Sequence, residues 1–475
     1  MERIKADDLY AYRFLSEVAV APDGAHAAFV SRRARDDGKG YYACIHLLDT
    51  ATGAVRPLTG NGDEAAFRWL DANTLIFPSC RTGDQPGKTA FYRLDIRGSE
   101  AERAFTIPLS VKQFHPLPDG RWFILTRRPM TSPEDLPADQ PQPGRDYTVF
   151  DELPFWADGL GMINGTRMSG WIFDPADGSV NQITPPTYDM EGAAVSPEGS
   201  RILYWGVSFE GIRPDYRQLM LYDLATGQTR SLVPDGKYRI TQVGWWGTDI
   251  WFEGGDPHTS VSRSPKLYLL NPATGDCRTF CAPDGFLGTS AIGDMSLGGG
   301  KVCAVQGDSL YAVRLQRDVT ALLRFDKAGN FAPVASYEGI ACFDIIGENA
   351  YLAAFRDHRP QELYRQPLSG GEPERLTQFH DAFLETRQIS RPEHITFRSR
   401  DGQEVDGWVI RPSGYEPGKK YPGVLNIHGG PKAAYGSQYY HEMQLLAAGG
   451  RFVFYTNPHG SDGRGQDYFD LVGRW

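Results

Sequence analysis

A short turn motif returns every 40 to 55 residues along most of this chain, between segments in which apolar and polar residues alternate. In the clear copies, an apolar residue is followed by aspartate or asparagine and, four residues later, by glycine. The clear copies are Leu48-Asp49 with Gly53, Phe173-Asp174 with Gly178, Tyr222-Asp223 with Gly227 and Leu270-Asn271 with Gly275, and the looser copies are Leu94-Asp95, Phe325-Asp326 and Pro367 with Gly371. Alternation over a few residues is typical of short strands, so the pattern predicts seven repeats built from strands and tight turns.

A second turn motif lies upstream in several repeats, at residues 21–24 (Ala-Pro-Asp-Gly), 117–120 (Leu-Pro-Asp-Gly) and 196–199 (Ser-Pro-Glu-Gly). Proline and the acidic residue favour a type I turn, and glycine supplies the positive φ that closes a hairpin. A repeat of about 45 residues made of short strands is typical of a four-stranded β-propeller blade. The sequence therefore predicts a mainly β protein in which residues 1–385 form a seven-bladed β-propeller, with residues 1–15 as a lead-in.

Composition and charge narrow the class of protein further. Glycine (53 residues) and proline (33 residues) are abundant without a collagen-like period, which fits a fold with many turns. The net charge of −10 and the lack of any Lys/Arg-rich run argue against nucleic-acid binding, because phosphate neutralisation needs a concentrated cationic surface. The N-terminus is charged where a signal peptide needs an apolar stretch, and no window approaches 18 apolar residues. We therefore expect a cytoplasmic protein without a membrane segment.

No metal site and no cofactor are predicted. The six cysteines, at positions 44, 80, 277, 281, 303 and 342, are dispersed, which fits reduced thiols better than a disulfide framework. Cys277 and Cys281 form the only close pair, and no second Cys or His pair with ligand spacing accompanies them. His441-Glu442 begins like the zinc motif H-E-x-x-H, but Leu445 occupies the position of the second ligand.

One repeat is stretched by a proline-rich insertion at residues 129–157, which ends in the aromatic segment Leu153-Pro-Phe-Trp156. Two interpretations are open for this insertion. It is either a solvated excursion or a loop whose aromatic side chains reach a ligand or a neighbouring domain.

The pattern changes after residue 385. In residues 404–411 apolar and polar residues alternate, which is typical of a half-buried strand. Residues 423–427 are mostly apolar, which predicts a fully buried strand that leads into His428-Gly-Gly-Pro431. Residues 439–448 have the composition of a helix closed by Gly449-Gly450, and a second buried strand follows at 452–455. Strand, glycine loop, helix and strand begin an α/β sheet, so the element order predicts an α/β domain at residues 386–475.

The glycine loop at 428–431 follows a buried strand directly, as in α/β-hydrolases, where glycines let a backbone N–H approach a developing alkoxide. A plain Gly/Pro turn is the alternative. The flanking residues favour the first interpretation, because they resemble the prolyl oligopeptidase family of serine peptidases, especially its acylaminoacyl-peptidase and dipeptidyl-aminopeptidase-like branch. The resembling stretches are Asp401-Gly402, Gly407-Trp408, Tyr421-Pro422, His428 to Pro431 and Asn457 to Gly465. In that family a seven-bladed propeller precedes an α/β-hydrolase domain, which matches the order of elements predicted here. The resemblance therefore implies that residues 386–475 are an incomplete α/β-hydrolase (peptidase) domain.

The resemblance implies roles for particular residues. It makes the backbone N–H of Gly430 one oxyanion donor, with His428 and Gly429 shaping that loop. It also implies that an active-site floor loop contains Asn457, Pro458, Gly460, Ser461, Gly463 and Gly465. Short peptides are the implied substrates, and endopeptidase, dipeptidyl-peptidase and acylaminoacyl-peptidase specificities are not separated. Exopeptidases of the family hold the substrate amino terminus with acidic propeller residues, and Glu210 is either such a residue or an ordinary loop carboxylate.

The catalytic nucleophile of the family is missing from this sequence. It lies in a G-x-S-x-G elbow beyond the floor loop, followed by the acid and the histidine, and none of the three occurs in the 475 residues. Gly307-Asp-Ser309-Leu-Tyr311 is half an elbow, but it lies in a repeat strand and ends in tyrosine. Ser461 lacks the elbow spacing, and His428 and His459 read as loop residues rather than bases. We therefore expect the chain alone to be inactive as a peptidase.

Three interpretations remain open. The chain is the N-terminal part of a longer serine peptidase, shortened by a premature stop, a frameshift or an incomplete gene model; or a non-catalytic propeller that binds peptides or proteins; or an enzyme of another type working in the propeller channel. The first is favoured because Trp475 would fall two strands into a sheet that needs further strands. It predicts that residues after 389 are less stable than the propeller, because buried-type strands keep open edges. A homo-oligomer is compatible with the sequence.

Overall fold

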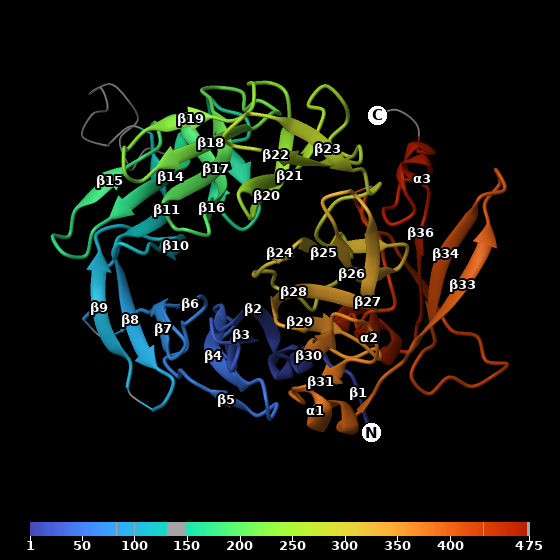
Figure 1. Ribbon diagram of the computed structural model, residues 1–475. Helices are drawn as coiled ribbons and strands as arrows, with labels where there is room; N and C mark the ends of the chain where they lie inside the picture. Colours follow the sequence, from blue (N-terminus) through green and yellow to red (C-terminus); the bar gives the residue numbers. More distant parts are fainter. Residues whose placement is uncertain (82, 99, 131–148, 431, 473–475) are drawn as a thin grey trace. The chain divides into compact units, whose positions relative to one another are not determined.

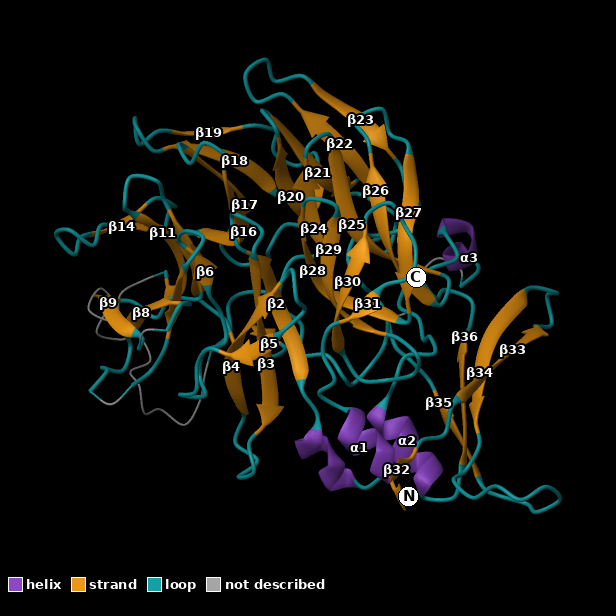
Figure 2. Cartoon of the chain, turned by 60° about the horizontal axis from the view of Figure 1, so that its bottom comes forward, coloured by secondary structure: helices purple, strands orange, loops and turns teal. Residues whose placement is uncertain are grey.

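The computed structural model describes residues 1–81, 83–98, 100–130, 149–430 and 432–472. Most of the secondary structure in this part of the chain is β-strand (Figure 1), and the helices are short (Figure 2). The chain divides into two compact units. Unit 1 contains residues 1–79, 94–101 and 281–475, and unit 2 contains residues 80–93 and 102–280. The domain boundary predicted near residue 385 does not coincide with this division and stays a prediction.

Unit 1 contains three antiparallel four-stranded sheets whose strands are bonded in sequence order. The first consists of β2 (Phe14–Val20), β3 (His26–Ala34), β4 (Tyr41–Asp49) and β5 (Val55–Pro57). The second consists of β24 (Cys303–Gln306), β25 (Ser309–Gln316), β26 (Val319–Phe325) and β27 (Phe331–Tyr337). The third consists of β28 (Gly339–Ile346), β29 (Asn349–Phe355), β30 (Glu362–Pro367) and β31 (Glu374–Arg375). A hairpin of β6 (Arg68–Trp69) and β7 (Thr74–Pro78) also belongs to this unit.

Unit 2 contains three further sheets of the same kind. They consist of β10 (Gln113–Pro116), β11 (Trp122–Pro129), β14 (Thr166–Phe173) and β15 (Val180–Gln182); of β16 (Tyr188–Val195), β17 (Arg201–Ser208), β18 (Gln218–Asp223) and β19 (Thr229–Ser231); and of β20 (Arg239–Trp246), β21 (Asp249–Gly255), β22 (Lys266–Leu270) and β23 (Cys277–Cys281). A hairpin of β8 (Thr89–Asp95) and β9 (Glu102–Ile107) and a short pair of β12 (Trp156–Ala157) and β13 (Gly161–Met162) complete it.

The two turn motifs of the sequence occupy fixed corners of these strand groups. The Pro-Asp/Glu-Gly turns join the first and second strands of a group, and the Asp…Gly motifs join the third and fourth. At Asp49, one carboxylate oxygen accepts the N–H groups of Ala51 (3.0 Å) and Thr52 (2.8 Å), and Gly53 follows with a φ of +74°. This local bonding, repeated at Asp223, explains why the motif recurs: the side chain builds the turn and glycine closes it.

Within unit 1, the first sheet packs against the sheet of β28 to β31. Leu15 and Phe29 lie in one buried cluster with Cys342 and Tyr351. Two polar contacts join the same sheets, since the backbone N–H of Val20 donates to Asp344 (2.9 Å) and that of Leu15 donates to Gln361 (2.8 Å). Strands that are more than 300 residues apart in the sequence are therefore held together by apolar packing and by hydrogen bonds between side chains and backbone.

The lead-in residues and the linker after β31 lie together in unit 1. Strand β1 (Glu2–Arg3) pairs in parallel with β32 (Arg387–Gln388), and the 3-10 helix η1 (Ala6–Ala11) follows β1. Helix α1 (Asp381–Thr386) precedes β32. Arg387 forms an ion pair of 2.8 Å with Asp8, which fastens η1 to the linker.

A mixed four-stranded sheet forms the last part of unit 1. It contains β33 (Pro392–Arg398), β34 (Glu404–Ile410), β35 (Gly423–Asn426) and β36 (Phe452–Asn457), in the order β33-β34-β36-β35. Strands β35 and β36 run parallel, and helix α2 (His441–Ala448) connects them. The helix predicted at 439–448 is thus confirmed, starting two residues later. A last helix, α3 (Gln466–Asp470), follows the sheet.

The prediction that residues 423–427 form a fully buried strand is wrong. Leu425 is 56% exposed and Ile427 is 74% exposed. Strand β35 is an edge strand, and α2 covers only the face of the sheet that carries Trp408, Val453 and Tyr455. On the opposite face, the side chains of β33 and β35 are largely exposed. The apolar composition that predicted burial therefore describes an open sheet face, to which Ile395 and Phe397 on β33 also contribute.

We expect lysine at Leu425 and Ile427 together to change the free energy of unfolding by no more than about 0.5 kcal/mol, because both side chains already face water. Binding of a hydrophobic dye should fall in the same variant. Lysine at Val453, which is fully buried under α2, is the matched control and should unfold the sheet. Urea unfolding followed by tryptophan fluorescence measures the free energy of unfolding of both variants. Equal destabilisation by the two changes would contradict an open face.

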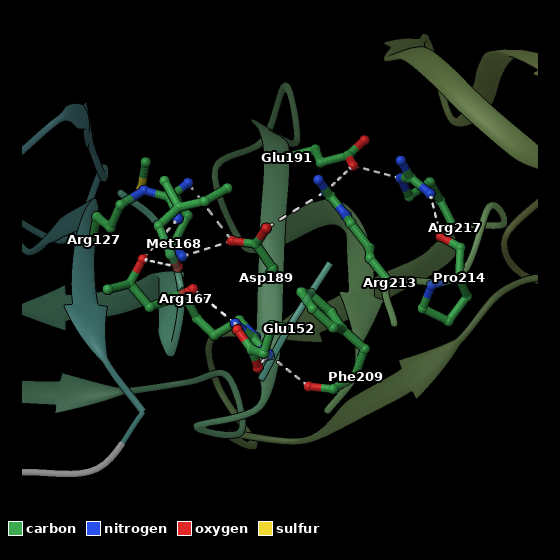
Figure 3. A network of polar contacts seen from close by, with 12 residues as sticks. Arg127, Glu152, Arg167, Met168, Asp189, Glu191, Phe209, Arg213, Pro214 and Arg217 are labelled. Atoms are coloured by element: carbon green, nitrogen blue, oxygen red, sulfur yellow. Dashed lines mark hydrogen bonds and ion pairs between the residues drawn. The ribbon is translucent and has the colours of Figure 1, made fainter. Parts of the chain in front are cut away.

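In unit 2, a buried ion pair fastens the end of the 129–157 insertion to β14 (Figure 3). Arg167 is 1% exposed, and its guanidinium donates to both carboxylate oxygens of Glu152, at 3.1 and 2.6 Å. It also donates to the carbonyl of Phe209 (2.7 Å) and lies over the ring of that residue. Residues 131–148 lie outside the described residues. Beyond them, Phe150 and Phe155 stack at 4.5 Å and Trp156 is 51% exposed, and both interpretations of the insertion remain open.

Glu152→Ala should lower the free energy of unfolding by about 3–5 kcal/mol, because it leaves the buried guanidinium of Arg167 without its counter-charge. Glu372→Ala removes the exposed partner of Arg356 (2.6 Å) and should cost no more than about 1 kcal/mol. Urea titration of both variants provides the comparison. A loss at Glu152 as small as the loss at Glu372 would show that the pair does not anchor the segment.

Candidate functional site

Two glycine-containing loops meet at one edge of the mixed sheet. The first loop follows β35, the second follows β36, and these strands are parallel neighbours with Asn426 beside Tyr455. The carboxyl ends of adjacent parallel strands lie at the same edge of a sheet, which is where α/β proteins place their ligands. The structure thus brings together the two segments, 428–430 and 457–465, that the sequence analysis selected.

The first loop is held by its histidine. The Nδ1 atom of His428 lies 2.8 Å from the carbonyl oxygen of Gly429, and its Nε2 atom lies 3.0 Å from the hydroxyl of Ser461 in the second loop. Gly430 has a φ of +132°, a conformation that favours glycine, and a Cβ there would approach the backbone nitrogen of Lys432 to 2.9 Å. Pro431 lies outside the described residues. Glycine at 430 is therefore required by the backbone itself.

Asn457 joins the two loops through their backbones. Its side chain is buried, its Oδ1 accepts the N–H of Tyr435 (2.7 Å), and its Nδ2 donates to the carbonyl of the same residue (2.9 Å). The hydroxyl of Tyr435 in turn donates to Asn426 at the end of β35 (2.7 Å). The predicted floor residue Asn457 thus fixes the course of the chain beyond the first loop and does not present its amide to solvent.

The rest of the second loop is compact. The N–H of Ser461 donates to the carbonyl of Pro458 (3.0 Å), and the N–H of Gly460 donates to that of Tyr468 (3.3 Å). Gly463 and Gly465 have φ values of +87° and +83°, and a Cβ on Gly463 would lie 2.5 Å from the carbonyl oxygen of Arg317. The close approach of another backbone explains why this loop needs glycine.

Asp406 lies behind the second loop and was not selected from the sequence. Its buried carboxylate accepts two bonds from Arg317 (2.9 and 2.6 Å) and lies 3.0 Å from Nε2 of His394 and 3.5 Å from Arg464. Arg317 stands between β25 and β26, and its backbone N–H also donates to Gly463 (2.6 Å). No local pattern marks Asp406, because its partners come from three different segments of the chain.

The charges around Asp406 decide its protonation. Burial by itself would raise the pKa of this carboxyl, but the bonds from Arg317 and His394 and the charge of Arg464 outweigh burial and lower the pKa below its usual range. A carboxyl with a lowered pKa in the folded state stabilises the fold above its unfolded-state pKa of about 3.9, and this contribution is lost as the pH falls through the folded-state value.

We therefore expect Asp406→Asn to lower the free energy of unfolding by about 1–3 kcal/mol at pH 6, where the carboxylate is charged. The difference from the parent chain should shrink as the pH falls from about 5 to about 2. Glu404→Gln is a matched control, because Glu404 also bonds Arg317 (2.8 Å) but is half-exposed. Urea midpoints measured across the pH range test this. A difference independent of pH would rule out the carboxylate charge as its source.

The described residues do not form a catalytic triad from the candidates of the sequence. Ser309 begins β25 opposite Gln306, in a hairpin and not in an elbow. His441 begins α2, and its Nδ1 lies 3.0 Å from the hydroxyl of Tyr12. His459 has Ser399 (3.3 Å) and Asp401 (3.6 Å) near the same ring atom, Nε2, whereas a triad needs the acid at the opposite nitrogen.

Other candidates of the sequence lie elsewhere. Glu210 is exposed in unit 2. Cys277 is exposed and Cys281 is buried, both on β23. Across the described ranges, no group of three or more His, Cys, Asp or Glu side chains is placed to hold a metal ion. Of the helices in those ranges, none is both long and apolar enough to cross a bilayer.

Known proteins similar to this chain are peptidases. No protein-family model matches it. The uncharacterized peptidase YuxL of Bacillus subtilis is 28% identical over 486 residues, covering 99% of this chain and 73% of that protein. Dipeptidyl-peptidase 5 of Porphyromonas gingivalis is 23% identical over 309 residues, covering 64% of this chain and 36% of that protein.

Solved structures agree on the fold. The acylaminoacyl peptidase of Pyrococcus horikoshii superposes with a TM-score of 0.78 at 20% identity, covering 99% of this chain and 69% of that one. A puromycin-hydrolysing peptidase of Mycobacterium tuberculosis superposes with a TM-score of 0.67 at 17% identity, covering 99% and 70%. The many small antiparallel sheets match the β-propeller part of the acylaminoacyl peptidase. The relatives and structural neighbours of this chain are thus peptidases of the prolyl oligopeptidase family, which confirms the resemblance seen in residues 401–465.

Proposed function

We propose that this chain is the N-terminal part of a serine peptidase similar to the prolyl oligopeptidase family. The parent reaction is hydrolysis of short peptides through an acyl-enzyme. One observation carries the proposal: the loops after β35 and β36, which hold Gly430 and Asn457, meet at the carboxyl edge of the sheet and bond each other through Ser461 and Tyr435. The names of the relatives, acylaminoacyl peptidase, dipeptidyl-peptidase and puromycin-hydrolysing peptidase, support short peptides and similar amides as substrates.

In this proposal six four-stranded sheets between Phe14 and Arg375, together with the strands β6 to β9 as a seventh group, are the blades of a seven-bladed β-propeller. Residues 386–475 begin an α/β-hydrolase domain. The turn motifs support the blades, because the Asp/Asn…Gly motif and its looser copies lie between the third and fourth strands of every group. The parallel pair β35 and β36 with its connecting helix α2 supports the second assignment, since a strand-helix-strand unit is the element from which such domains are built.

The backbone N–H of Gly430 is the proposed oxyanion donor. A donor of this kind stabilises the negative oxygen of a tetrahedral intermediate, and removing one costs about 3–4 kcal/mol of transition-state stabilisation in a serine peptidase. His428 and Gly429 shape the loop that carries this N–H. The floor loop from Asn457 to Gly465 supports it from the neighbouring strand.

An oxyanion donor without a nucleophile stabilises an intermediate that nothing forms. The 475 residues contain no G-x-S-x-G elbow, and the described residues form no triad from the candidate serines and histidines. We therefore propose that the chain by itself does not hydrolyse peptides.

A fluorophosphonate probe, which reacts with activated serine hydroxyls, should leave this chain unlabelled, because none of the serines that the structure describes has both a base and an orienting acid in triad geometry. A serine peptidase treated in parallel shows that the probe is active. Intact-mass measurement gives the stoichiometry. One probe per chain in the native protein, absent after heat denaturation, would contradict the proposal, and Ser309→Ala and Ser461→Ala variants would then show which hydroxyl reacts.

A second function, a non-catalytic propeller that binds peptides or proteins, is favoured by one observation. Phe150, Phe155 and Trp156 in unit 2 expose 37 to 51% of their surfaces on a segment fixed by the buried pair of Glu152 and Arg167. Exposed aromatic side chains on a rigid support are typical of interaction surfaces. Reading the gene beyond the codon for Trp475 in all frames separates the two proposals: an elbow serine followed by Asp and His supports the peptidase, and unrelated sequence supports the binding module.

A further inference from the structure

The ring of His428 bridges the two loops, and its contacts fix which nitrogen carries the hydrogen. Nδ1 lies 2.8 Å from the carbonyl oxygen of Gly429, and a carbonyl oxygen only accepts hydrogen bonds. Nδ1 must therefore be the protonated nitrogen. In the neutral ring Nε2 is then an acceptor, so the hydroxyl of Ser461, 3.0 Å away, donates to it. Ser461 and His428 thus form a directed chain of two hydrogen bonds that ends on the Gly429 carbonyl.

That carbonyl belongs to the same peptide unit as the N–H of Gly430. A peptide unit is planar and, in the trans form, its C=O and N–H point in opposite directions. Holding the oxygen of Gly429 therefore also fixes the direction of the Gly430 N–H. This matters because the unit lies between two glycines, whose backbones otherwise rotate more freely than those of any other residue.

Ser461 is itself held firmly. It is 1% exposed, and its N–H donates to Pro458 (3.0 Å). The next residue, Asp462, donates its N–H to Ala433 (3.0 Å) and accepts the hydroxyl of Ser290 at 2.6 Å. A serine hydroxyl bonded to a histidine whose other nitrogen is oriented by an acceptor is also the arrangement of an activated nucleophile. Burial of Ser461 keeps a substrate from reaching it, so the arrangement serves to orient a backbone group.

We infer that Ser461 and His428 are positioning residues that set the direction of the Gly430 N–H, with Ser461 acting through the Nδ1-protonated ring of His428. This inference rests on the proposed function, in which that N–H is an oxyanion donor. It adds a role for the hydroxyl of the second loop: by donating to Nε2, the hydroxyl supports the tautomer in which Nδ1–H holds the first loop.

The inference can be tested by observing the ring of His428 and the amide of Gly430 in this chain, without substrate. Protein labelled with ¹⁵N-histidine, studied by NMR at about pH 8.5 where imidazole is neutral, should show His428 with its hydrogen on Nδ1. His428→Gln identifies the signals. Ser461→Ala should replace this pattern by the averaged signals of two tautomers. It should also shift the Gly430 amide, which ¹³C,¹⁵N-glycine labelling selects as one of six Gly-Gly amides in the sequence.

Ser399→Ala is the matched control, because its hydroxyl lies 3.3 Å from Nε2 of another histidine, His459, and it should leave His428 and Gly430 unchanged. Ser461→Thr keeps the hydroxyl and should restore the parent signals. A hydrogen on Nε2 of His428 in the parent chain overturns the inference, and that measurement does not depend on any variant folding. Unchanged His428 and Gly430 signals in Ser461→Ala overturn it as well.

The same measurements separate this inference from the proposed function. If His428 has the stated tautomer and the Gly430 amide responds to Ser461, the positioning role stands, even if a longer product of the gene fails to hydrolyse peptides. If such a product hydrolyses peptides while the ring carries its hydrogen on Nε2, the proposed function stands and the positioning role is refuted.

Discussion

The candidate site depends on the buried carboxylate of Asp406. It lies in β34 and gathers Arg317 from a turn between repeat strands, Arg464 from the floor loop and His394 from β33. A buried carboxylate is costly unless charged and hydrogen-bonding groups surround it, and here these groups come from separate segments. Those segments are thereby held in one arrangement. The backbone N–H of Arg317 also donates to the carbonyl of Gly463 in the floor loop, so a repeat sheet and the mixed sheet position the same loop.

The fixed floor loop positions the other groups of the site one after another. Ser461 is placed by the loop, His428 is oriented by Ser461, and the peptide before Gly430 is held by His428. Asn457 ties the same two loops together on their other side through the backbone of Tyr435. The polar groups of the site therefore bond mainly to one another and to backbone, which pre-organises one N–H without supplying a group that attacks a substrate.

The covered face of the mixed sheet also relies on distant parts of unit 1. Helix α2 receives no side-chain cap from its own N-cap residue, and the carboxylate of Asp294 accepts the N–H groups of His441 (2.9 Å) and Glu442 (2.8 Å) instead. Burial raises the pKa of Asp294, and the two N–H bonds partly offset this rise. Tyr12, from the lead-in, bonds the hydroxyl of Tyr439 just before the helix (2.7 Å). The lead-in is therefore part of the support of α2.

The sequence by itself determined the features that depend on neighbours within a few residues. The corner at Asp49, the end of α2 at Gly449 and the glycine at 430 follow from local hydrogen bonds and from the allowed φ values. The tertiary structure alone decided which polar groups meet. Asp406 with Arg317, Asp294 with α2, and Ser461 with His428 are separated by 33 to 148 residues, and no local pattern specifies such pairs. Apolar composition likewise predicted a buried strand at 423–427, but exposure depends on what packs over the sheet, and Leu425 lies on the uncovered face.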